Sequence, residues 1–96
     1  MQYDKQKLNE ICKTRGISYL ALFGSRARGD FRPASDVDLL VDYFRDSPVK
    51  GLISHIGVAQ EFEDLFNKPV DLIERNILKP ELKSYIEQDL QTLYEG

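Results

Sequence analysis

The sequence predicts a small α/β or α+β domain in which helices pack on a short mixed β-sheet. Short apolar runs typical of buried strands alternate along the chain with longer segments whose apolar residues keep helical spacing. At 96 residues, with 42% hydrophobic and 30% charged residues, the chain has the composition of a globular protein and room for one modest core. We therefore expect residues 1–96 to form a single domain.

The first half of the chain is expected to contain two helices and two strands. An apolar helical stripe that includes Leu8 and Cys12 is stopped by Gly16 in a C-cap position. Ser25 can cap a short helix that Gly29 would end. The expected elements are a helix over about 3–15, a strand over 19–23, a helix over 25–28, a loop over 30–35 and a strand over 37–43.

The second half is expected to add two helices and one strand. Apolar residues at helical spacing from Leu52 to Phe66 predict a long helix, and the run VDLIE over 70–74 predicts a third strand. Pro80 opens a final helix, because a missing N–H costs nothing in the first turn. We expect that helix to carry an apolar stripe of Leu82, Tyr85, Ile86, Leu90 and Leu93. Residues 44–50 are expected to form a solvated loop, with a lid as the alternative.

Composition and charge narrow the classes of function. The net charge of −3 and the pI near 5.1 argue against non-specific binding of nucleic acid, which depends on a basic surface. The polar N-terminus lacks the features of a secretory signal, and no apolar run is long enough to span a bilayer. The single cysteine, Cys12, excludes an internal disulfide and fits a reducing cytoplasm.

Three aspartates in or beside the predicted strands are the candidate catalytic and metal-binding residues. Asp36 and Asp38 stand two residues apart at the head of a strand, so their side chains point to the same face. Two neighbouring carboxylates repel unless a positive charge lies between them, and a divalent metal that carries a nucleoside triphosphate is the natural candidate. Asp71 can join them if its strand is a neighbour in the sheet. Three carboxylates and phosphate oxygens form the environment that Mg²⁺ prefers.

The turn between the first strand and the short helix is the candidate nucleotide-binding segment. Gly24 lets a phosphate approach the backbone, and the free N–H groups after Ser25 suit its oxygens. Arg26 could neutralise phosphate charge or form a structural ion pair, and the sequence favours neither. Arg28, at the end of the short helix, favours a structural role. The only histidine, His55, has no Cys or His partner at ligand spacing, which favours a structural role as well.

The stretch GSRARGDFRPASDVDLLVDY resembles the signature of the DNA polymerase β-like nucleotidyltransferase superfamily, which is Gly-Ser, ten residues, then Asp-x-Asp. Gly24 and Ser25 match its first part, and Asp36 and Asp38 match its second. Asp71 in PVDLIE is similar to the family's third carboxylate. Over nearly its whole length the chain most resembles the minimal nucleotidyltransferases, in particular the MntA-type antitoxins encoded beside HEPN-domain ribonuclease toxins.

The resemblance implies a polymerase β-like fold with about four helices around the sheet. It also implies the transfer of AMP from ATP to a hydroxyl group, with loss of pyrophosphate. Asp36 and Asp38 would bridge two Mg²⁺ ions, and Asp71 would complete the shell of the catalytic ion and help to accept the hydroxyl proton. Gly24 and Ser25 would hold the terminal phosphates.

The resemblance further implies a partner protein as the acceptor, namely a HEPN ribonuclease modified on a tyrosine. The short chain supports a protein acceptor, because larger relatives carry an extra helical domain that grips the base and the acceptor. Two alternatives remain open at this point. One is an antitoxin that neutralises its partner by binding alone, and the other is a nucleotidyltransferase with a small-molecule acceptor.

Overall fold

A four-stranded mixed β-sheet forms the centre of the protein, with strand order β3-β2-β1-β4. The computed structural model describes residues 2–29 and 36–96. Its strands are β1 (Ile17–Phe23), β2 (Val37–Tyr43), β3 (Val70–Glu74) and β4 (Gln91–Glu95). β1 is antiparallel to both β2 and β4, whereas β3 runs parallel to β2. The predicted class, helices on a short mixed sheet, is confirmed.

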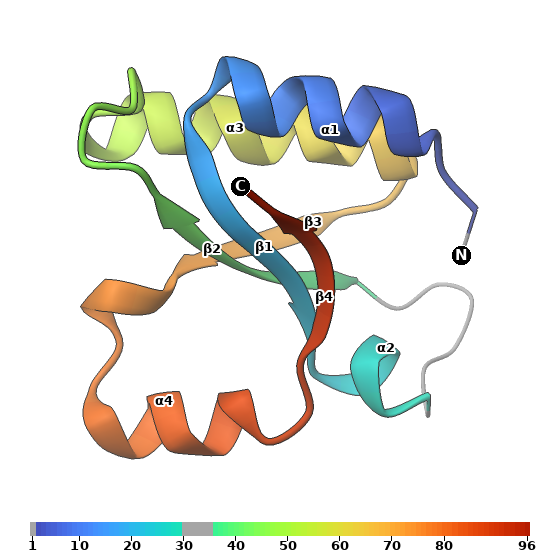
Figure 1. Cartoon of the computed structure of the whole chain (residues 1–96). Helices are drawn as coiled ribbons and strands as arrows, with labels where there is room; N and C mark the ends of the chain where they lie inside the picture. The colour runs from blue at the N-terminus through green and yellow to red at the C-terminus, as the bar shows by residue number, and fades with distance from the viewer. Residues whose placement is uncertain (1, 30–35) are drawn as a thin grey trace.

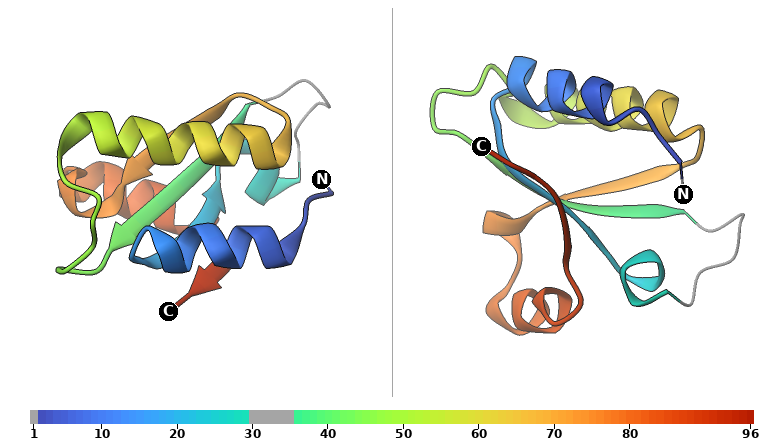
Figure 2. Two further views of the ribbon diagram at one scale, coloured as in Figure 1. Left: turned by 90° about the horizontal axis from the view of Figure 1, so that it is seen from above. Right: turned by 45° about the vertical axis from the view of Figure 1, so that its right-hand side comes forward.

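The helices lie on both sides of this sheet. They are α1 (Lys5–Thr14), α2 (Ser25–Arg28), α3 (Gly51–Phe66), the 3₁₀ helix η1 (Arg75–Ile77) and α4 (Pro80–Glu87). α1 and α3 run side by side over one face, and α4 lies on the opposite side (Figures 1 and 2). α2 follows directly on the end of β1. The predicted bounds of α2, β2 and β3 agree with the structure, whereas those of α1, β1 and α3 differ by one or two residues at one end or both. The loop expected over 30–35 lies outside the described residues.

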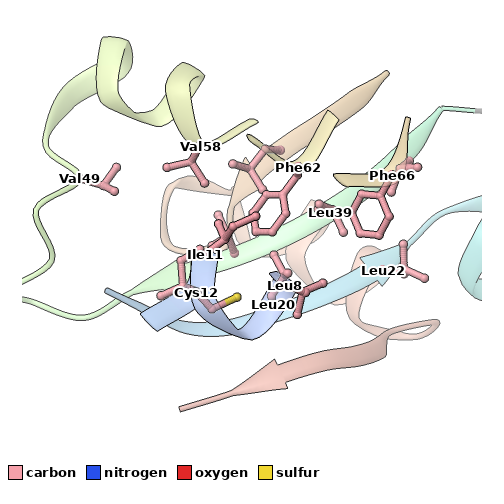
Figure 3. Packing of buried hydrophobic residues seen from close by; sticks show 14 residues of the cluster. Leu8, Ile11, Cys12, Leu20, Leu22, Leu39, Val49, Val58, Phe62 and Phe66 are labelled. Carbon is pink, nitrogen blue, oxygen red and sulfur yellow. The ribbon is translucent and has the colours of Figure 1, made fainter. Parts of the chain in front are cut away.

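The hydrophobic core lies between the sheet and the pair α1 and α3. Phe62 of α3 is fully buried there, close to residues of α1 and of the sheet (Figure 3). Cys12 of α1 is also fully buried, and this burial raises the pKa of its thiol to about 12. The cluster comprises Leu8, Ile11, Cys12, Ile17, Leu20, Leu22, Val37, Leu39, Val41, Val49, Val58, Phe62, Phe66 and Leu72. No helix among the described residues is apolar and long enough to cross a bilayer.

Side-chain alternation makes the two faces of the sheet different. Leu20 and Leu22 in β1 and Leu39 in β2 belong to the core cluster. The residues between them, such as Ala21 and Asp38, therefore project from the opposite face. α4 lies on the side of this second face (Figure 1). No residue of α4 is itself buried, although Ala21 and Leu40, which project from this face by alternation, are fully buried.

The prediction for the last part of the chain is wrong in one respect. The expected apolar stripe would extend the final helix to Leu93, but α4 ends at Glu87 and residues 91–95 form β4. Leu93 and Tyr94 pack against the core from this strand, while Leu82 and Tyr85 are exposed. The open edge of β1 supplies hydrogen-bond partners for β4, and such tertiary pairing overrides a local helical pattern.

The loop over 44–50 is held to the body of the protein and is not fully solvated. Ser47 is only 2% exposed, and its hydroxyl donates to the carbonyl of Arg15 at 2.5 Å. The same oxygen accepts the N–H of Val49 at 3.1 Å, and Val49 reaches the core cluster. The expectation of a solvated loop therefore holds only for its exposed residues, such as Arg45 and Lys50.

Replacing Gly57 with alanine is expected to stabilise the fold. Gly57 lies inside α3, and a Cβ at this position would have no atom within 4 Å. Alanine restricts the unfolded chain and favours the helix, so we expect the free energy of unfolding to rise by about 0.5–1 kcal/mol. Urea denaturation of both proteins measures the difference. A lower midpoint for Gly57→Ala would contradict the expectation.

Candidate functional site

Two of the predicted carboxylates stand side by side on neighbouring strands. Asp38 of β2 and Asp71 of β3 are partners in the register of the parallel pair. In a parallel pair such residues project from the same face of the sheet. The condition under which Asp71 is expected to join the other aspartates, that its strand β3 lies next to β2, is therefore met. Asp36 lies just before β2 and is exposed, as is Asp71, whereas Asp38 is half-buried.

The three carboxylates lie close enough for Asp36 and Asp71 to act electrostatically on Asp38. Burial raises the pKa of Asp38, and the negative charges of Asp71 and Asp36 raise it further. The positive charges of Arg26 and Arg28 act in the opposite direction. An ionised Asp38 is thus disfavoured by its surroundings, and a cation beside it would relieve the repulsion.

The glycine–serine turn lies directly against Asp38. Gly24 has φ 71° and ψ −151°, a backbone conformation that suits glycine. A Cβ on Gly24 would come within 2.5 Å of Asp38 Oδ2, so the carboxylate occupies the space that a side chain would need. The register agrees, since Phe23 is the partner of Asp38. The two halves of the motif, which ten residues separate in the sequence, therefore lie together in one site.

Ser25 does not have the capping role expected from the sequence. The N-cap of α2 is Gly24, which makes no side-chain capping bond, and Ser25 is the first residue of the helix itself. The expected end of α2 is confirmed, because Gly29 is its C-cap with φ 86°. The glycine before Ser25 sets the turn, because its unusual φ and ψ redirect the chain from β1 into α2.

Arg26 is a buried part of the site. Arg26 is only 6% exposed, and its Nε donates a hydrogen bond to the backbone carbonyl of Asp36 at 3.4 Å. Arg26 thus connects α2 to the segment that carries the aspartate pair and directs its charge towards Asp38. Arg28 is exposed, and its charge also acts on Asp38.

The donor set fits Mg²⁺ bound together with a nucleotide. Within residues 2–29 and 36–96, no three His, Cys, Asp or Glu side chains already stand close enough to hold a metal ion alone. Mg²⁺ usually takes one or two carboxylates and fills its shell with phosphate oxygens and water. Asp38 and Asp71, with Asp36 beside them, suit that arrangement.

A polar network at the far end of the same face was not predicted. Arg75 of η1 binds Asp42 through Nη2–Oδ2 at 2.6 Å and Glu87 of α4 through Nη1–Oε1 at 3.2 Å. The Arg75 guanidinium lies 4.3 Å from the ring centroid of Tyr19. The network holds α4 to the edge of the site face. Asp42 shares the strand face of Asp38 by alternation, which is the one sequence signal that could have indicated it.

The fold and these paired carboxylates define the class of protein. Residues 5–93 match the family described as "Nucleotidyltransferase domain", and the chain belongs to this family. It is 39% identical over 87 residues to a Methanocaldococcus jannaschii protein provisionally named a protein adenylyltransferase, a match over 90% of this chain and 83% of that protein. It is 33% identical over 70 residues to the protein adenylyltransferase MntA of Thermococcus cleftensis, over 73% and 68% of the two chains.

Solved structures share the fold. A toxin–antitoxin structure with AMP-PNP superposes with a TM-score of 0.78 at 20% identity, over 97% of this chain and 74% of that one. An MNT antitoxin in complex with the tri-AMPylated HEPN toxin of Shewanella oneidensis gives a TM-score of 0.69 at 18% identity, over 96% and 70%. The expected polymerase β-like architecture is confirmed by these likenesses and by the family match.

Proposed function

We propose that the protein is a Mg²⁺-dependent adenylyltransferase that transfers AMP from ATP to a tyrosine hydroxyl of a HEPN toxin, and so acts as its antitoxin. The observation that carries the proposal is the contact of Gly24 with Asp38 beside the in-register Asp71. This contact brings a phosphate-compatible turn and two carboxylates together at the head of β2. Relatives named protein adenylyltransferases support the reaction, and the AMPylated toxin complex of a structural neighbour supports the partner.

The residues have distinct roles in the proposed reaction. Mg²⁺ would be held by Asp36, Asp38 and Asp71, and it would stabilise charge on the triphosphate and lower the pKa of the attacking hydroxyl. Gly24 lets the terminal phosphates approach the backbone of the turn at Ser25. The acceptor oxygen bonds to the α-phosphorus, the bond from that phosphorus to the β-bridging oxygen breaks, and pyrophosphate leaves. Asp71, exposed at the edge of the sheet, takes the hydroxyl proton.

Arg26 is proposed to act on the leaving group through its charge. It is held in place by the carbonyl of Asp36, so its guanidinium is ordered before the nucleotide binds. A fixed positive charge stabilises the developing pyrophosphate at little reorganisation cost. The sequence left open whether Arg26 makes a structural contact or neutralises phosphate charge. In this proposal it does both, because the contact with Asp36 positions its guanidinium.

The second face of the sheet supports a protein as the acceptor. It carries the aspartates, and α4 beside it contributes exposed Leu82 and Tyr85 with no buried residue of its own. The exposed Asp36 and Asp71 leave this part of the face open to a large acceptor. The proposal includes a single minimal nucleotidyltransferase domain over residues 1–96. It also includes a cytoplasmic location, which the unpaired, buried Cys12 supports.

Two differently labelled forms of ATP test the proposal. The protein, Mg²⁺ and the product of the adjacent gene are incubated with ATP labelled on either the α- or the γ-phosphate. We expect label on the partner from α-labelled ATP only, lost on addition of EDTA, and mass spectrometry to place AMP on a tyrosine. Transfer of γ-label would show phosphorylation. If the partner is neutralised with no label of either kind, the protein acts by binding alone and the enzymatic proposal is wrong.

A further inference from the structure

The strand that carries Asp71 lies at the edge of the sheet. In the described part of the chain, β3 pairs with β2 on one side only. Within a strand, the N–H and C=O groups of one residue point to one side, and the sides alternate from residue to residue. The carbonyl of Pro69 accepts the N–H of Val37 at 2.9 Å, which turns it towards β2. The backbone groups of Val70 and Leu72 therefore point outward.

Two side chains of α3 satisfy those outward groups. Glu63 Oε2 accepts the N–H of Val70 at 3.2 Å, and His55 Nε2 lies 2.8 Å from the carbonyl oxygen of Leu72. Val70 and Leu72 are the two neighbours of Asp71 in the chain. Glu63 and His55 are about two helical turns apart, so both face β3 from one side of α3. Together they occupy the hydrogen-bonding positions that a further strand would fill.

The contacts of His55 fix its orientation and its tautomer. A carbonyl oxygen can only accept, so Nε2 carries the proton that is donated to Leu72. The other ring nitrogen, Nδ1, lies 2.9 Å from the hydroxyl of Tyr43, which ends β2. In the neutral imidazole with its proton on Nε2, Nδ1 accepts, so the hydroxyl of Tyr43 is the donor. Burial, with the charge of Glu74, raises the pKa of Tyr43 and keeps the proton on that hydroxyl. One hydrogen-bonded chain thus connects β2, α3 and β3.

We propose that Glu63 and His55 form an edge clamp that positions Asp71 against Asp38. The inference rests on the proposed function, in which both carboxylates hold Mg²⁺. An unclamped edge strand frays easily, and a displaced Asp71 would no longer share a cation with its neighbour. Groups that orient metal ligands from behind affect metal affinity and rate about 10–100-fold, although they touch neither metal nor substrate. Glu63 and His55 are therefore positioning residues.

Paired variants separate the clamp from a merely structural role. For Glu63→Ala and His55→Ala we expect kcat to fall about tenfold with KM for ATP nearly unchanged, because Gly24 and Ser25 are untouched. Glu63→Gln keeps an acceptor oxygen and His55→Gln keeps a donor, so both should recover most of the rate. Glu61→Ala is the matched control, because Glu61 lies on the same helix and pairs with Arg15 instead. It should lower thermal stability without lowering kcat.

A second readout is independent of AMP transfer. Amide hydrogen exchange at Val70 should accelerate in Glu63→Ala, exchange over residues 70–74 should accelerate in His55→Ala, and neither should change in Glu61→Ala. The affinity for Mn²⁺, titrated at saturating AMP-PNP, should weaken about tenfold in both clamp variants. Unchanged exchange and Mn²⁺ binding in them would overturn the clamp, whatever the activity. If the wild type transfers no AMP, the proposed function fails, and exchange with Mn²⁺ binding still decides for or against the clamp.

Discussion

Asp38→Asn is expected to abolish AMP transfer while leaving the protein folded. In the proposed reaction, the substitution removes one of the negative oxygens that would hold the metal with the triphosphate, and such charge stabilisation lowers the barrier by about 4 kcal/mol or more. We therefore expect the rate of transfer to fall at least about a thousandfold. Transfer of α-labelled AMP to the partner measures the loss, and circular dichroism confirms the fold. Activity within about tenfold of the wild type would exclude Asp38 as a metal ligand.

The same variant is expected to be more stable than the wild type at neutral pH. Burial and the charges of Asp71 and Asp36 raise the pKa of Asp38 above its ordinary value of 3.8. A carboxyl with a raised pKa stabilises the fold most when it is protonated, and that stability is lost as the pH rises through the folded-state pKa. An asparagine side chain does not ionise, so the variant does not lose this stability as the pH rises. Urea midpoints should therefore differ most near pH 7 and converge below about pH 4.

Gly24→Ala is expected to impair both stability and transfer. The added Cβ would lie 2.5 Å from Asp38 Oδ2, so the carboxylate must move, and φ 71° with ψ −151° strains any L-residue. We expect the free energy of unfolding to fall by about 1–3 kcal/mol. Displacement of Asp38 by about an ångström should slow transfer about a hundredfold. Urea denaturation and initial rates of AMP transfer measure the two effects.

Gly29→Ala is the matched control for this experiment. Gly29 ends α2 with φ 86°, but a Cβ there would meet no atom within 4 Å. It should lose about 1–2 kcal/mol of stability through its left-handed backbone and keep most of its activity. Equal losses of activity in the two variants would show that backbone strain alone, without the contact to Asp38, explains the effect of Gly24→Ala.

Most of the candidate site could be located from the sequence because most of it is local in sequence. The aspartate pair, the glycine turn and the strand between Val37 and Tyr43 depend on alternation and turn preference, which short segments encode. The position of Asp71 needed the parallel pairing of β3 with β2, which no local pattern specifies. From the sequence, Asp71 could be placed beside Asp38 only on the condition that their strands are neighbours, and the strand order of the structure shows that they are.

The elements that were missed depend on contacts between distant segments. β4 forms because β1 offers an open edge, although residues 91–95 lie just after a helix. Arg75 and His55 bind groups on other elements, at Asp42 and at the carbonyl of Leu72. Side-chain bonds of this kind follow from the packing of α3, η1 and α4 around the sheet and leave no periodic signal in the sequence.

The two faces of the sheet differ in how much stability a substitution costs. Substitutions under α1 and α3 would leave cavities around Phe62 and cost several kcal/mol, of the order of 3–5 for its truncation to alanine. Residues of the other face, such as Tyr19 and Thr92, lie outside the core cluster, so replacing them opens no hole in it. Under the proposed function, substitutions on this face that alter the choice of acceptor would therefore cost little stability, provided that Gly24 and the aspartates stay in place.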